Sequence, residues 1–202
     1  QVDDDSDHPL LKGAVDYEAA LEQSSSEKPK VQWDPDDLYM LYTGGTTGMP
    51  KGVLWRQGDI ITSALGGKNS DGTVIDDIEV FQQRALSKKR HRFLTTPPFM
   101  HGASHWLAFN AWHGGNTVII QDDVEKLDPT DILRVIEREK ATALMLVGDA
   151  FGRPILDEMK KTRYDFSSIV NVMNSGAVLS QPVKQGILEK IPGARILDNM
   201  GA

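Results

Sequence analysis

The chain has 202 residues, of which 40% are hydrophobic and 25% are charged. These fractions are typical of globular proteins and exclude a disordered chain, so we expect one packed domain with a sizeable core. The formal net charge of −7 excludes a general attraction to nucleic acid or to anionic membranes, and any polyanion must therefore bind at a local site.

Further features of the sequence limit the class of protein. The chain contains no cysteine, which excludes a disulfide framework, a thiolate metal cluster and a cysteine nucleophile within these residues. No apolar run approaches the ~18 residues needed to span a bilayer, and no basic-then-apolar leader opens the sequence. We therefore expect a soluble, cytoplasmic protein without a transmembrane segment. A first residue of glutamine and a strand-like run close to the last residue suggest an internal piece of a longer protein.

The elements predicted in chain order form an α/β fold. Residues 1–36 are expected to be a surface lead-in with one short helix near residues 16–21. In residues 37–202, short apolar runs alternate with amphipathic segments, which predicts a mainly parallel sheet with helices on both faces. The run 143–147 is apolar throughout, as in a strand covered on both sides. The predicted strands are residues 38–43, 93–96, 117–120, 143–147, 169–173 and 195–197.

The helices between these strands have readable ends. Asp128 as N-cap and Pro129 at the first helical position predict a helix whose apolar stripe includes Ile132 and Ile136. Two further helices are predicted over residues 151–160 and 182–190. Residues 66–92 do not show this alternation of strands and helices and are expected to form an exposed excursion between two strands. Its basic run, residues 88–92, is interpreted as a solvated face and not as a nucleic-acid site.

The most informative stretch is residues 42–53, Tyr-Thr-Gly-Gly-Thr-Thr-Gly-Met-Pro-Lys-Gly-Val. Its glycines allow successive backbone N–H groups to turn toward one anionic ligand, and its threonine hydroxyls add further donors. Lys51 supplies a mobile point charge that suits a polyphosphate. A standard P-loop is excluded, because Pro50 precedes the lysine and Gly52 follows it. The loop is expected to join two strands, and an ordinary glycine-rich hairpin is the structural alternative.

This stretch resembles the phosphate-binding loop of the adenylate-forming superfamily, which includes acyl-CoA synthetases, luciferases and nonribosomal peptide synthetase adenylation domains. The chain is most similar to the synthetases of the fatty-acid type. The resemblance implies that the loop and its lysine hold the β and γ phosphates of ATP, with Thr46 and Lys51 as catalytic candidates. The loop residues so assigned are Thr43, Gly44, Gly45, Thr46, Thr47, Gly48 and Lys51.

Four further stretches resemble motifs of the same superfamily in the same order. Residues 94–102 place His101 at the border of the acyl pocket, as a third catalytic candidate, and residues 147–150 place Asp149 in that pocket. Residues 174–179 and 198–202 resemble the two runs that border adenine, with Met200 where a stacking tyrosine is usual. The adenine-side residues so assigned are Ser175, Gly176, Ala177, Asp198, Asn199, Met200 and Gly201. Each stretch follows a predicted strand, so one crevice at the carboxyl ends of the strands holds them all.

Competing interpretations of single residues remain. His101 and His105 are spaced as a zinc pair, but Gly102 stands where a zinc hydrolase needs glutamate, so no metal site is predicted. His101 is alternatively a core histidine, and Asp149 is equally well a helix cap. The aromatic residues at 106, 109 and 112 are interpreted as helix packing. No G-x-S-x-G motif of a serine hydrolase occurs.

The implied activity is formation of an acyl adenylate from ATP and a small carboxylic acid, followed by transfer of the acyl group to coenzyme A. Met100 and His101 stand where amino-acid-activating enzymes place an aspartate, which disfavours an amino-acid substrate. The resemblance also implies that the Mg²⁺-binding glutamate, the ribose aspartate and a lysine of a C-terminal domain lie beyond these residues, so the 202 residues alone are expected to be inactive. The alternatives are a noncatalytic nucleotide-binding module, an adenylation domain that loads a carrier protein, and a purely structural α/β domain.

Overall fold

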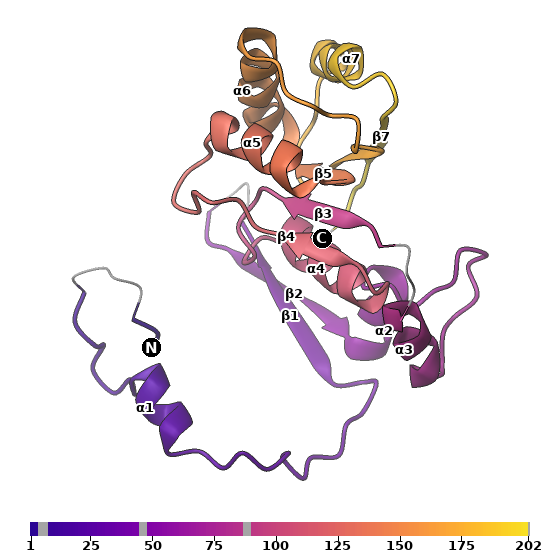
Figure 1. The fold of residues 1–202 in the computed structure, drawn as a ribbon. Helices are drawn as coiled ribbons and strands as arrows, with labels where there is room; N and C mark the ends of the chain where they lie inside the picture. The colour runs from indigo at the N-terminus through magenta and orange to yellow at the C-terminus, as the bar shows by residue number, and fades with distance from the viewer. Residues whose placement is uncertain (4–7, 45–47, 87–89, 202) are drawn as a thin grey trace. The chain divides into compact units, whose positions relative to one another are not determined.

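The computed structural model describes residues 1–3, 8–44, 48–86 and 90–201 (Figure 1). The chain divides into two compact units, Gln1–Trp33 and Asp34–Ala202. The first unit contains helix α1 (Tyr17–Glu22), which begins where the Asp16 side chain accepts a hydrogen bond from the Ala19 amide at 2.9 Å. No residue of this helix is buried, so α1 is held by its cap and local contacts and not by a core.

A β-hairpin opens the second unit. Strand β1 (Leu38–Thr43) pairs antiparallel with β2 (Lys51–Arg56), and the last pair of the ladder is Thr43 with Lys51. This confirms the prediction that the glycine and threonine loop joins two strands. Gly45, Thr46 and Thr47 at the loop centre lie outside the described residues. Helix α2 (Gln57–Ser63) follows directly, and Ile60 is its buried residue.

The excursion predicted for residues 66–92 contains a helix that the sequence pattern did not indicate, α3 (Ile78–Leu86). The Phe81 ring lies 5.1 Å from the ring of His113. The Arg84 guanidinium donates to the carbonyl oxygens of Gly66 and Lys68, each at 3.1 Å. These contacts to distant residues stabilise α3, which explains why periodicity alone did not reveal it.

The remaining strands form one parallel sheet in the order β4-β3-β5-β6-β7. Their positions confirm the α/β prediction, although β6 begins two residues later than expected because the Ile169 amide closes a turn on the Phe166 carbonyl. The second of the predicted helices begins earlier than expected, at Gly148. The strands are β3 (Arg92–Thr95), β4 (Thr117–Ile119), β5 (Ala143–Leu146), β6 (Asn171–Asn174) and β7 (Arg195–Asp198). The helices are α4 (Gly102–His113), α5 (Pro129–Glu139), α6 (Gly148–Lys161) and α7 (Gln181–Lys190).

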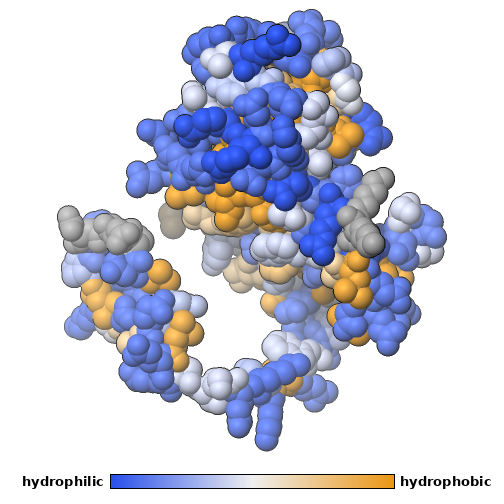
Figure 2. All heavy atoms as spheres, in the orientation of Figure 1, coloured by the Kyte–Doolittle hydropathy of each residue, from blue (hydrophilic) through white to orange (hydrophobic). Residues whose placement is uncertain are grey.

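The two faces of this sheet carry separate apolar clusters, because successive side chains of a strand point to opposite sides. The larger cluster joins Leu94, Leu144 and Val172 to the buried faces of α5, α6 and α7. The smaller cluster joins Met145 to Ala103 and Leu107 of α4. Figure 1 shows α5, α6 and α7 on one side of the sheet and α4 on the other. Figure 2 shows hydrophilic residues over the outer side of α5, with hydrophobic residues beneath them at the level of the sheet.

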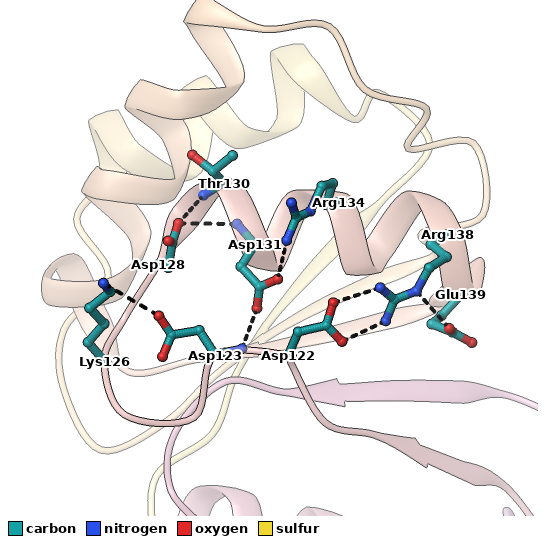
Figure 3. Close-up of polar contacts among 9 residues, drawn as sticks. All are labelled: Asp122, Asp123, Lys126, Asp128, Thr130, Asp131, Arg134, Arg138 and Glu139. Atoms are coloured by element: carbon teal, nitrogen blue, oxygen red, sulfur yellow. Dashed lines mark hydrogen bonds and ion pairs between the residues drawn. The ribbon is translucent and has the colours of Figure 1, made fainter.

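A polar network fixes the start of α5 (Figure 3). The Asp128 carboxylate accepts hydrogen bonds from the Thr130 and Asp131 amides at 2.9 and 3.2 Å, as expected of the predicted N-cap. The Asp131 side chain is buried and accepts from the Asp123 amide at 2.9 Å and from Arg134 at 2.9 Å. The network therefore ties the β4–α5 loop to the first turn of the helix. Among the described residues, no helix is both long and apolar enough to cross a membrane.

Replacing Asp128 with alanine should lower the free energy of unfolding by about 1 kcal/mol, because two amides of the first turn lose their acceptor. Urea denaturation measures the change. Asp157→Ala is the matched control, because Asp157 pairs only with Lys160 at the exposed surface of α6 and should have a smaller effect. An equal loss in both variants would show that the cap contributes nothing particular.

The contact between Lys140 and Asp165 should make stability sensitive to acid. Hydrogen bonds from Ser167, followed by the Lys140 ammonium, hold the pKa of the Asp165 carboxyl below its usual range. A lowered pKa in the folded state adds stability above the unfolded pKa of about 3.9, and this stability is lost as the pH falls toward the folded pKa. Asp165→Asn should therefore flatten the fall in unfolding free energy between about pH 4 and pH 2.

The matched control for this measurement is Asp76→Asn, which removes one carboxylate from an exposed loop residue. If Asp76→Asn flattens the curve as much as Asp165→Asn does, net charge and not the contacts of Asp165 with Ser167 and Lys140 governs the acid limb.

Candidate functional site

A cavity of about 610 Å³ lies beside α4, where that helix, the β1–β2 hairpin and the carboxyl ends of β5, β6 and β7 approach one another. Its floor is apolar and comes from residues of three neighbouring strands, Phe93, Met145 and Met173. One wall is α4, which contributes Gly102, Ala103, Trp106, Leu107 and Asn110. The remaining lining residues are Leu41, Tyr42, Thr43, Gly44, Ser63, Ala64, His101, Ser175, Gly176, Asn199, Met200 and Gly201.

Asn174 organises the edge of the sheet at this cavity. Its side chain is only 4% exposed, and its Oδ1 accepts a hydrogen bond from the Gly148 amide at 2.7 Å. Its Nδ2 donates to the Ala177 carbonyl and to the Asp198 carboxylate, each at 3.0 Å. One buried amide thus joins the ends of three strands, which sequence reasoning missed. A polar residue ending an apolar strand was the available signal.

Two glycines permit the close approach of the loops after β5 and β6. Gly148 has φ of 59°, and a Cβ there would lie 2.7 Å from the Ala177 Cβ. Gly176 has φ of 78°, and a Cβ there would lie 3.2 Å from Cε1 of His101. A side chain at Gly148 would force the two loops apart, whereas a side chain at Gly176 would press on the His101 ring. The backbone of Gly176 therefore lies directly beneath the imidazole ring.

His101 is the N-cap of α4, with its Nδ1 accepting a hydrogen bond from the Ala103 amide at 3.1 Å. In the neutral ring the proton is therefore on Nε2, which can donate to an oxygen of a ligand. His101 lines the cavity and is not buried, so the interpretation as a core histidine does not describe it. His105 instead contacts the rings of Tyr39 and Phe109 in tilted geometry, with ring centroids 5.7 and 5.1 Å away.

Trp106 contacts the β1–β2 hairpin, in addition to the helix packing that was expected. Its Nε1 donates to the Tyr39 hydroxyl at 3.0 Å, and its ring meets Trp55 edge-on with centroids 6.1 Å apart. The same ring lines the cavity. The contacts with the hairpin hold it in place as a rigid wall. Phe109 and Trp112 do pack against each other, as predicted.

The hairpin loop contributes Thr43 and Gly44 to the cavity. Gly48 has φ of 136°, a conformation that a side chain rarely allows. Lys51 is exposed at the start of β2, outside the cavity lining, and its carbonyl accepts a hydrogen bond from the Thr43 hydroxyl at 3.4 Å. Within the described part of the chain, no ion pair holds its ammonium group.

Asp149 does not line the cavity, in contrast to the pocket position that the resemblance implied. Its carboxylate accepts hydrogen bonds from the Ser180 amide at 2.7 Å and from Arg153 at 2.7 and 3.0 Å. These contacts with Ser180 and then Arg153 hold the pKa of the Asp149 carboxyl below its usual range. Because Ser180 is the N-cap residue of α7, Asp149 connects α6 to the start of α7. These contacts support the alternative interpretation of Asp149 as a residue that connects two helices, and its place in the acyl pocket stays a prediction.

Of the seven residues assigned to the adenine side, five line the cavity and two do not. Ser175, Gly176, Asn199, Met200 and Gly201 line the cavity, and Met200 is fully exposed. Ala177 and Asp198 do not. Asp198 forms an ion pair with Lys184 and accepts a hydrogen bond from Asn174, and these two partners, the lysine first, hold the pKa of the carboxyl below its usual range.

The described residues offer no evident place for a metal ion. No group of three or more His, Cys, Asp or Glu side chains gathers anywhere in the described ranges. The carboxylates of Asp149 and Asp198, which adjoin the loops after β5 and β6, are each paired with a basic side chain. These residues do not fit a magnesium ion, whereas the His101 Nε2 is a donor that can meet an oxygen of a phosphate or carboxylate.

Comparison with known proteins identifies the family of the chain. The chain is 45% identical over 203 residues to the medium-chain acyl-CoA ligase Mig of Mycobacterium avium, covering all of this chain and 37% of the relative. It is 34% identical to a 3-oxocholest-4-en-26-oate--CoA ligase of Rhodococcus rhodochrous, covering 94% of this chain and 35% of the relative. The chain thus spans little more than a third of the length of these relatives.

Solved structures with the same fold are more distant in sequence. The inhibitor-bound N-terminal domain of FACL13 from Mycobacterium tuberculosis matches with a TM-score of 0.65 at 19% identity, covering 92% of this chain and 42% of that one. A luciferase-like enzyme from the mealworm Zophobas morio matches with a TM-score of 0.64 at 17% identity, covering 91% of this chain and 39% of that one. The family model described as AMP-binding enzyme matches residues 2–202. The chain therefore belongs to the AMP-binding enzyme family, the adenylate-forming group that the loop at residues 42–53 resembles.

Proposed function

We propose that this chain is part of an AMP-forming acid–thiol ligase that activates a carboxylic acid with ATP and transfers the acyl group to coenzyme A. One observation carries the proposal: a single cavity meets the glycine and threonine hairpin and the His101 ring at one end and has an apolar floor beside them. The names of the relatives, which are acyl-CoA ligases, support the same class of reaction. The nucleotide- and acyl-binding portion is residues 37–202, in a cytoplasmic enzyme.

The nucleotide occupies the end of the cavity formed by the loops. The amides of the loop that includes Gly44 and the ammonium of Lys51 neutralise the β and γ phosphates. Thr46 acts from the same loop, together with Gly45 and Thr47. The backbone of residues 175–177 and 199–201 borders adenine, where Met200 supplies an apolar contact instead of an aromatic stack. Anion binding by loop amides and a flexible ammonium is chemically suited to a leaving pyrophosphate.

The acid lies with its carboxylate near His101 and its apolar part over the floor of the cavity. A carboxylate oxygen attacks the α-phosphorus of ATP, the bond to the bridging oxygen breaks, and pyrophosphate leaves. The thiol sulfur of coenzyme A then attacks the acyl carbon and AMP leaves. His101 can donate from Nε2 to the reacting carboxylate or phosphate oxygen, because its Nδ1 is occupied by the Ala103 amide. Mg²⁺ would be held by residues other than those described and enters no step here.

Replacing Lys51 with alanine should weaken binding of ATP to the purified chain by about tenfold, because a charged contact to phosphate is lost. Isothermal titration calorimetry measures the dissociation constant. Lys68→Ala is the matched control, since Lys68 is also exposed but lies in the loop after α2, and it should leave the constant unchanged. If the wild type, Lys51→Ala and Lys68→Ala have the same dissociation constant for ATP, the result favours a purely structural α/β domain.

A second measurement tests the reaction itself. The 202 residues alone should form no AMP from ATP and acid, whereas a longer polypeptide that continues through a Mg²⁺-binding glutamate and a C-terminal lysine domain should catalyse carboxylate-dependent pyrophosphate exchange. The same polypeptide should release AMP with coenzyme A as acceptor. Absence of exchange with every acid would favour a noncatalytic nucleotide-binding module, and transfer to a carrier protein instead of coenzyme A would indicate a loading domain.

A further inference from the structure

One face of α4 lines the cavity over about two turns of the helix. Ala103, Trp106, Leu107 and Asn110 follow the spacing of residues that share a helix face, and all of them line the cavity. The distance from Ala103 to Asn110 along the axis is about 10 Å. Because His101 caps the N-terminal end of α4, the loop end of the cavity lies at that end of the helix and Asn110 lies at the other.

The far end is bridged by a polar contact. Asn110 donates from Nδ2 to the Ala64 carbonyl at 3.3 Å, and both Ala64 and its neighbour Ser63 line the cavity. The segment 64–66 also contacts α4 through His113. His113 contacts the Leu65 carbonyl through Nδ1, and a Cβ on Gly66 would lie 3.3 Å from the His113 Cβ, so this backbone packs directly on α4.

The walls between the two ends leave little room for adjustment. Trp106 is fixed by its hydrogen bond to Tyr39 and by its edge contact with Trp55. The floor belongs to three hydrogen-bonded strands, and Met145 is only 3% exposed. The side of the cavity is therefore apolar and held by these contacts, whereas the amide-to-carbonyl contact of Asn110 with Ala64 lies at its far end, at the protein surface.

From this arrangement we infer that Asn110, together with the Ala64 carbonyl, determines the length of the acid that the enzyme accepts. The inference rests on the proposed function. Asn110 is exposed, so an alkyl chain that extends past it has to displace the amide from the carbonyl and then leaves the apolar floor and walls for the protein surface, where it gains no further apolar contact. A chain that stops short of them contacts only the apolar floor and walls. The site therefore favours unbranched acids of medium length over long ones.

The test is a length profile of kcat/KM for pyrophosphate exchange by the longer polypeptide, with hexanoate, octanoate, decanoate, dodecanoate and hexadecanoate as acids. Asn110→Ala should raise the ratio of kcat/KM for hexadecanoate to that for octanoate by about tenfold, since a bound chain end then meets no polar barrier. Asn110→Phe should move the optimum toward hexanoate by filling the far end. The KM for ATP, whose site is at the opposite end, should stay within about twofold.

His113→Ala is the matched control, because it removes a different side-chain contact to the 64–66 segment without changing a lining residue. It should leave the length profile unchanged. A profile that is the same in wild type, Asn110→Ala and Asn110→Phe overturns the inference, and so does an equal shift in His113→Ala. Activity with some acid but no length effect leaves the proposed function intact, whereas absence of exchange with every acid in the wild type overturns both. Asn110→Ser, a milder change, replaces Asn110→Ala if thermal unfolding shows loss of folding.

Discussion

The buried Asn174 side chain is the contact on which the geometry of the candidate site depends. Its hydrogen bonds to Gly148, Ala177 and Asp198 set the positions of the segments that follow β5, β6 and β7. A buried amide is costly unless each of its groups is paired, so the three segments are most stable in the one arrangement that pairs them all. The glycines at 148 and 176 make that arrangement sterically possible.

The unequal covering of the sheet explains why the cavity lies where it does. Three helices pack over one face and close a continuous core, in which Leu144 and Val172 are fully buried. On the other face α4 covers the sheet only in part, and the hairpin and α2 approach from the side, leaving Met145 and Met173 as a floor. Apolar surface beside a polar loop is the combination that an acid with an apolar tail and a nucleotide require together.

Charge is arranged around the cavity in a way that suits a polyanion, although the chain as a whole is acidic. Asp149 and Asp198 lie close to the loops of the site, yet each is paired with a basic side chain, Arg153 and Lys184 respectively. Lys51 carries no such partner among the described residues and keeps its positive charge available. Neutralising nearby carboxylates while leaving one ammonium unpaired lowers the repulsion that a triphosphate would meet.

The sequence by itself determined the features that depend on neighbouring residues: the parallel α/β class, the strands, the Asp128 cap of α5 and the hairpin position of the glycine and threonine loop. It also indicated the family, because the loop motif is local in the chain. Tertiary structure decided that Asp149 accepts a hydrogen bond from Ser180, that Trp106 lines the cavity, and that Asn110 contacts Ala64. These contacts join residues 31, 67 and 46 positions apart, and periodicity carries no information on such pairs. Which faces meet is settled only when the helices and strands pack together.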